Sequence, residues 1–129
     1  LLAGDAAELP FPFAESAAAM PQISESLARM AALDPGVALY CHAPVTAGPK
    51  VLEQNIAYFT TLEHHCSAAL AQGVPARPPA DADVEALVGF PYAAAVPLEQ
   101  DAEALAGFYR PGHQAAIRMM LQHVAGRAE

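Results

Sequence analysis

Two residues carry side chains that suit metal chemistry and stand where a loop begins. Asp5 and His42 each follow a short apolar run and each opens a loop. A carboxylate can bridge two cations, and a neutral imidazole donates one lone pair to a metal. The carboxyl ends of strands are also where α/β proteins place ligands and catalytic groups. We take Asp5 and His42 as candidate metal ligands, although a turn aspartate and a buried structural histidine would give the same pattern.

The other histidines and cysteines form weaker candidates. His64, His65 and Cys66 are adjacent in a predicted helix, where successive side chains point about 100° apart and cannot converge on one ion. Cys41 precedes His42, and the alternation of side chains along a strand would point its thiol the other way. His113 follows Pro111-Gly112 near an expected helix start, where a structural role is favoured over a pocket role. We expect none of these five residues to bind metal.

The elements that must position these residues follow an α/β order. Two apolar runs, residues 1–7 and 37–41, are predicted as buried strands that end near Asp5 and His42. Four helices are predicted from apolar spacings of three and four, from capping residues and from prolines. The first two cover residues 21–33 and 51–72. The third is short, is capped by Asp81 or Asp83 and ends at Val88. The fourth covers about 98–126, with a kink near Pro111-Gly112.

The apolar faces of three helices predict the core. These faces consist of Ile23, Leu27, Met30 and Leu33; of Leu52, Ile56, Phe59, Leu62, Cys66 and Leu70; and of Leu105, Phe108, Ile117, Met120, Leu121 and Val124. The two strands look buried on both faces, yet a two-stranded sheet cannot bury itself. We therefore expect another segment to complete the sheet. The absence of an initiator methionine agrees with a chain that begins partway through a domain.

The composition excludes several classes of protein. The net charge is -8 with only 6 Lys and Arg, and these form no stripe that could follow a phosphate backbone. No apolar stretch approaches the roughly 20 residues that span a bilayer, and residues 1–5 do not look like a signal peptide. Two cysteines do not suggest a disulfide framework. We expect a cytoplasmic protein that binds neither nucleic acid nor membrane.

A longer pattern adds weight to the Asp5 and His42 pair. The chain reads Leu-Leu-x-Gly-Asp-Ala, a Pro/aromatic loop, a helix with Ser-Leu-x-x-Met-x-x-Leu-Asp-Pro, a strand ending in His, Pro-Val, and a long helix with Asn-x-x-Tyr. This order resembles the C-terminal half of metallo-β-lactamase-fold hydrolases. The resemblance covers residues 1–73, and it implies that 74–129 form a C-terminal helical extension of the same domain. The implied fold is the C-terminal half of an αββα sandwich, whose sheet is completed by a missing or separate N-terminal half.

The resemblance also implies a function. Asp5 would bridge two divalent metal ions, zinc in the usual case, and His42 would complete the second metal site. A metal-bound hydroxide would attack an ester, thioester, lactone, amide or phosphoester of a small-molecule substrate. Phe11, Phe13 and the loop containing Pro44 would shape the substrate pocket. No residue of this chain is assigned a catalytic role beyond metal binding.

Two departures keep other interpretations open. The family surrounds the last histidine with glycines, whereas this chain has Cys41-His42-Ala43-Pro44. The His-x-His-x-Asp-His motif, which supplies most ligands in the family, is absent from the 129 residues, so a complementary N-terminal half must carry it. The alternatives are a non-catalytic helical module that docks on a partner chain, and a degenerate family member that has lost the chemistry.

Overall fold

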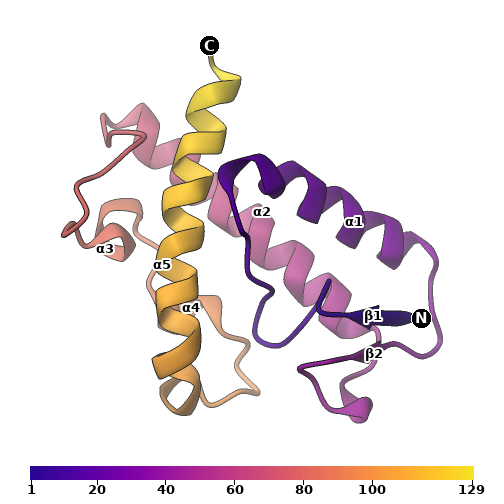
Figure 1. The fold of residues 1–129 in the computed structure, drawn as a ribbon. Helices are drawn as coiled ribbons and strands as arrows, with labels where there is room; N and C mark the ends of the chain where they lie inside the picture. The colour runs from indigo at the N-terminus through magenta and orange to yellow at the C-terminus, as the bar shows by residue number, and fades with distance from the viewer.

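The computed structural model describes all residues from 1 to 129 (Figure 1). Its elements, in chain order, are β1 (Leu2–Gly4), η1 (Ala17–Ala19), α1 (Met20–Ala32), β2 (Leu39–Tyr40), η2 (Val45–Ala47), α2 (Lys50–Ala71), α3 (Val84–Val88), α4 (Tyr92–Ala95) and α5 (Ala102–Arg127). The structure is therefore mixed α/β and mostly helical, with two very short strands. None of its helices combines the length and apolar character needed to cross a membrane.

Three helices form the framework. α1 lies along α2, and α5 crosses α2 as a second long rod (Figure 1). α2 and α5 bury side chains in one hydrophobic core. Residues from the loops after β1 and β2, and from α3 and α4, belong to the same core. The predicted ranges 1–73 and 74–129 thus share a core. Its largest fully buried members on the long helices are Leu52, Leu62, Ile117, Met120 and Leu121.

Most helix predictions are confirmed to within a few residues. The helices expected over 21–33 and 51–72 are α1 and α2, and Gly73 follows α2 with a positive φ of 95°. Asp83 rather than Asp81 caps α3, because its Oδ1 accepts a hydrogen bond from the amide of Ala86 at 3.2 Å. The short helix α4 has no counterpart in the prediction.

The last helix, predicted over about 98–126, is α5, and it differs from the prediction at its start. It begins after Asp101, whose carboxylate caps it at the Ala104 amide, and not at residue 98. It also runs through Pro111 as one continuous helix, where a proline usually breaks or kinks the helix. Buried side chains on both sides of the proline, Tyr109 and His113, hold the two parts against the same core.

The strands are shorter than expected and are buried on one face only. β1 and β2 pair in parallel, with Leu2 opposite Leu39 and Gly4 opposite Tyr40. Ala3 and Ala38 point into the core, whereas Leu2 on the opposite face is 83% exposed. Val37 and Leu39 belong to that exposed face as well, so the prediction of strands buried on both sides is wrong for this chain. We call Leu2, Val37 and Leu39 the open sheet face.

Candidate functional site

Parallel pairing brings Asp5 and His42 to the same edge of the sheet. Gly4 ends β1 with a positive φ of 59°, a conformation that glycine adopts without strain. Its carbonyl accepts a hydrogen bond from the amide of Cys41 at 3.2 Å, which continues the pairing one residue beyond β2. The next residue of each segment is then Asp5 or His42. The Oδ1 of Asp5 lies 3.1 Å from the Nε2 of His42.

The two side chains stand at the surface. The side chain of Asp5 is 71% exposed and that of His42 is 59% exposed. An exposed pair of this kind contributes little to stability, because water screens the charges. The pair is therefore better placed to meet a ligand than to hold the fold together.

The distance between the donor atoms fits two ligands of one cation. Zinc bonds of about 2.1 Å at a tetrahedral angle place neighbouring donors roughly 3.4 Å apart. The observed 3.1 Å is close to that separation. No cluster of three His, Cys, Asp or Glu side chains in the structure could hold a metal ion. The same separation is that of a direct ion pair, so a metal site here would need further ligands from elsewhere.

The thiol of Cys41 lies near Asp5, which differs from the expected orientation. The negative charge of Asp5 raises the pKa of the exposed Cys41 thiol above its ordinary value. The predicted alternation fails because β2 ends at Tyr40 and the chain bends directly afterwards.

Glu8 is a buried carboxyl group close to the Asp5 and His42 pair, and no sequence pattern marked it. The hydroxyl of Tyr109 on α5 donates a hydrogen bond to its Oε2 at 2.8 Å. Burial raises the pKa of Glu8, whereas that hydrogen bond and the charge of the nearby His42 lower it. Glu8 is a single charged residue in a loop of apolar residues after Asp5, and a residue of this kind is normally predicted to lie at the surface.

Backbone contacts fix the loop that carries Glu8. The side chain of Asn55 accepts a hydrogen bond from the Glu8 amide at 3.0 Å and donates one to the Glu8 carbonyl at 2.8 Å. The amide of Leu9 donates to the carbonyl of His42 at 3.3 Å. The loop after Asp5 is thereby joined to α2 and to the segment of His42. These contacts give the Asn-x-x-Tyr pattern of α2 a structural role.

The three predicted pocket residues have different surroundings. Phe11 is 1% exposed and its ring stacks on Tyr58 with centroids 4.2 Å apart, so it belongs to the core and faces no surface pocket. Phe13 is 39% exposed and its ring lies 5.3 Å from that of Phe108, which is itself 67% exposed. The prediction that Phe108 faces inward is wrong. Pro44 is exposed just before η2.

The remaining histidines have different surroundings. Cys66 is buried and His64 is exposed, and the Nδ1 of His65 lies 3.0 Å from the carbonyl of Val88. His113 is fully buried in the middle of α5, and not near a helix start. Its Nε2 lies 2.9 Å from the carbonyl of Phe90, and its Nδ1 lies 2.9 Å from the hydroxyl of Tyr58.

These two contacts define the protonation state of His113. A carbonyl can only accept, so Nε2 carries the proton and Nδ1 accepts from the tyrosine hydroxyl. Burial lowers the pKa of His113, which favours this neutral form. The residue links α2, α5 and the segment after α3 in the core.

Comparison with known proteins found no relative of this chain. No protein-family model, curated protein or solved structure matches the chain. The relationship to metallo-β-lactamase-fold hydrolases stays a prediction, and the case for the site rests on its geometry.

Proposed function

We propose that this chain is the C-terminal part of a metal-dependent hydrolase and supplies two ligands of its metal site. The observation that carries the proposal is the 3.1 Å approach of Asp5 Oδ1 to His42 Nε2 at the carboxyl ends of two parallel strands. A carboxylate and an imidazole at that separation suit a divalent cation such as zinc. Parallel strand ends are also the usual position of such sites in α/β proteins.

Each residue of the candidate site would have a separate role. Asp5 and His42 would hold and orient the ions, and the loop fixed by Asn55 would keep Asp5 in place. Two bound divalent cations supply an activated water for attack on an ester, thioester, lactone, amide or phosphoester. Phe13, which is partly exposed on the loop following Asp5, would contact an apolar part of the substrate.

The remaining ligands would come from a complementary N-terminal segment with a His-x-His-x-Asp-His motif. Leu2, Val37 and Leu39 form an open sheet face that no part of this chain covers. Apolar side chains on an exposed strand pair are suited to packing against a second sheet, with a gain of about 25 cal/mol for each Å² of apolar surface buried. Such a sheet would extend to the same edge that carries Asp5 and His42.

The test uses two ligand variants in the complete protein. Asp5→Asn and His42→Gln should each lower the metal content by about half or more and reduce hydrolysis at least about 100-fold, because each removes a ligand. Asp81→Asn and His64→Gln change an exposed aspartate and an exposed histidine away from the site and serve as matched controls. Full metal content and unchanged turnover in Asp5→Asn would overturn the proposal.

The open sheet face also favours a second candidate, a non-catalytic module that docks on a partner chain. In that case the partner carries no metal ligands, and both Asp5→Asn and His42→Gln leave the assembly and its composition unchanged. A degenerate hydrolase would instead pair with the complementary half and contain no metal. Metal analysis of the assembled protein separates the three.

A further inference from the structure

Glu8 is a buried carboxyl group without a cationic partner. It is 5% exposed, and no lysine, arginine or histidine forms an ion pair with it in the structure. The comparable buried carboxylate, Glu85, pairs with Arg110 at 2.8 Å. An ionised carboxylate that is buried without a cation destabilises the folded state, and a single hydrogen bond offsets this only in part. The burial of Glu8 therefore points to a role other than stability.

Contacts from two helices nevertheless hold Glu8 in one position. Asn55 on α2 bonds both the amide and the carbonyl of Glu8. The hydroxyl of Tyr109 on α5 donates to its Oε2 at 2.8 Å, and Tyr109 is the only side chain that bonds the carboxyl group. The other oxygen, Oε1, is left without a partner from this chain.

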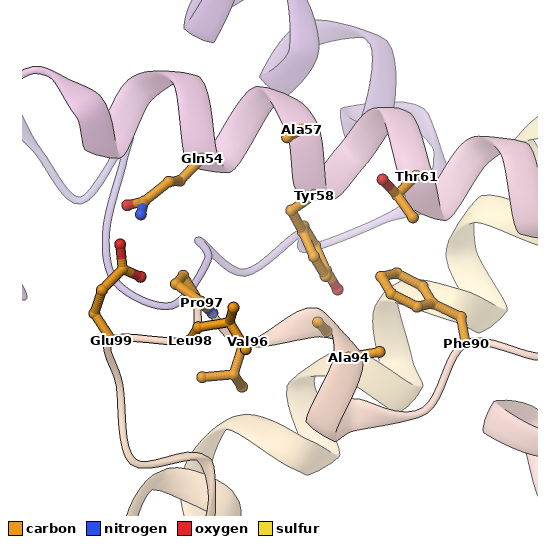
Figure 2. Close-up of a pocket in the computed structure, with 11 residues that line it drawn as sticks. Gln54, Ala57, Tyr58, Thr61, Phe90, Ala94, Val96, Pro97, Leu98 and Glu99 are labelled. Atoms are coloured by element: carbon orange, nitrogen blue, oxygen red, sulfur yellow. The ribbon is translucent and has the colours of Figure 1, made fainter.

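The ring of Tyr109 is fixed independently of Glu8. It meets the edge of Phe11 with centroids 5.8 Å apart and planes at 84°. Phe11 in turn stacks on Tyr58, whose ring extends from α2 beside Phe90 (Figure 2). Burial and the negative charge of Glu8 raise the pKa of Tyr109, so its hydroxyl keeps the proton that it donates. The hydrogen-bond donor of Glu8 is thus held in place before any ligand arrives.

The carboxyl group of Glu8 lies close to the two candidate ligands. It follows Asp5 by three residues, and the amide of the next residue, Leu9, donates to the carbonyl of His42 at 3.3 Å. Burial raises the pKa of Glu8, and among its charged neighbours His42 lowers that pKa and Asp5 raises it. A divalent cation between Asp5 and His42 would bring the positive charge that Glu8 lacks in this chain.

We propose that Glu8, held by Tyr109, is a positioning residue of the candidate metal site, an inference that rests on the proposed function. Its buried negative charge strengthens the binding of cations at Asp5 and His42 without contributing a ligand. Carboxylates behind the ligands of a metal typically account for about 10–100-fold in metal affinity. Through Tyr109, the C-terminal helix α5 also takes part in the site.

The experiment compares metal affinity with stability in the complete protein. Its metal is removed with a chelator, and Zn²⁺ is titrated back at neutral pH against a chromophoric competitor. Glu8→Gln keeps the size of the side chain and an oxygen that accepts from Tyr109, but it removes the charge. We expect Glu8→Gln to bind Zn²⁺ at least about tenfold more weakly than the wild type. In the metal-free protein, urea unfolding should show this variant to be as stable as the wild type or more stable.

Three further variants show which group is responsible. Glu15→Gln removes an exposed carboxylate from the same loop and should leave the Zn²⁺ affinity unchanged. Tyr109→Phe should weaken Zn²⁺ binding at least about threefold, because the carboxylate loses the donor that fixes it. Tyr92→Phe is its matched control, since it removes a buried hydroxyl that has no partner.

Each contrary result has a distinct meaning. Unchanged Zn²⁺ affinity in Glu8→Gln, together with lost affinity in Asp5→Asn, would overturn the role of Glu8 and leave the proposed function intact. A clear loss of stability in metal-free Glu8→Gln, or an equal loss of affinity in Glu15→Gln, would also overturn that role. Unchanged affinity in both Glu8→Gln and Asp5→Asn would overturn the proposed function as well.

Discussion

At the scale of single residues, His113 is the polar group on which the core depends most clearly. It is fully buried, and both ring nitrogens have partners, the carbonyl of Phe90 and the hydroxyl of Tyr58. Sequence position suggested a residue near a helix start, with a structural role favoured over a pocket role, because Pro111-Gly112 looked like a helix boundary. The continuous α5 places it instead in the centre of the molecule. Its neutral state makes the stability of the protein depend on pH.

We predict that His113→Gln lowers the free energy of unfolding by about 1–3 kcal/mol above about pH 7.5, because Tyr58 and Phe90 lose well-aligned partners. Burial holds the pKa of His113 below its ordinary value of 6.5. As the pH falls below that value, the unfolded chain binds a proton that the folded chain does not, so the wild type loses stability. Glutamine does not titrate, so the difference between variant and wild type should shrink at acid pH.

Urea unfolding at a series of pH values measures this difference. His64→Gln is the control, since His64 is exposed and its replacement should have little effect at any pH. A difference for His113→Gln that stays constant from neutral to acid pH would contradict a neutral buried histidine.

At the scale of elements, the loop after Asp5 is fixed by its contact with α5. The ring of Phe13 lies directly over Gly112, where a Cβ would come within 2.1 Å of the ring carbon Cε1. Glycine in the middle of a helix normally costs up to about 1 kcal/mol relative to alanine. The close approach of Phe13 explains why a glycine is needed there. Gly107 lies on the same helix and has nothing within 4 Å of such a Cβ.

Gly112→Ala should therefore make the protein less stable than Gly107→Ala by about 1–3 kcal/mol, because the new methyl group displaces the Phe13 ring. Gly107→Ala should be neutral or stabilising. Thermal or urea unfolding of both variants gives the comparison. In a Phe13→Ala background the penalty at position 112 should disappear. If Gly112→Ala remains as destabilising without Phe13, the loop contact is not its cause.

Most of the helices could be predicted from the sequence because each has a local signal. α1 and α2 follow from apolar spacing, and the cap of α3 is one of the two candidate aspartates. A helical region across Pro111 was predicted with a kink, and α5 is one helix there, whereas the short α4 was not predicted. The sequence also indicated that the sheet needs another segment, but it could not show which face stays open, because apolar side chains give the same pattern whether a partner covers them or not.

The candidate site was partly predictable for a similar reason. Asp5 and His42 are recognisable because each ends a strand, and parallel pairing then places them together at 3.1 Å. The burial of Glu8 and Phe11 depends on Asn55, Tyr58 and Tyr109, which are distant in the sequence. Such contacts leave no periodic signal in the chain.

At the scale of the whole molecule, two features point beyond this chain. The open sheet face exposes Leu2, Val37 and Leu39, and the edge next to it carries two candidate metal ligands, fewer than a metal site needs. One complementary segment with a second sheet and the His-x-His-x-Asp-His motif would cover the open sheet face and supply the missing ligands.

Intact mass and metal analysis of the protein purified from its source cells tests this account most directly. It predicts that residues 1–129 occur together with a His-x-His-x-Asp-His segment, in the same polypeptide or in a second one, and that each assembly holds two divalent metal ions. An assembly that contains such a segment but no metal, or a partner without metal ligands, would contradict it.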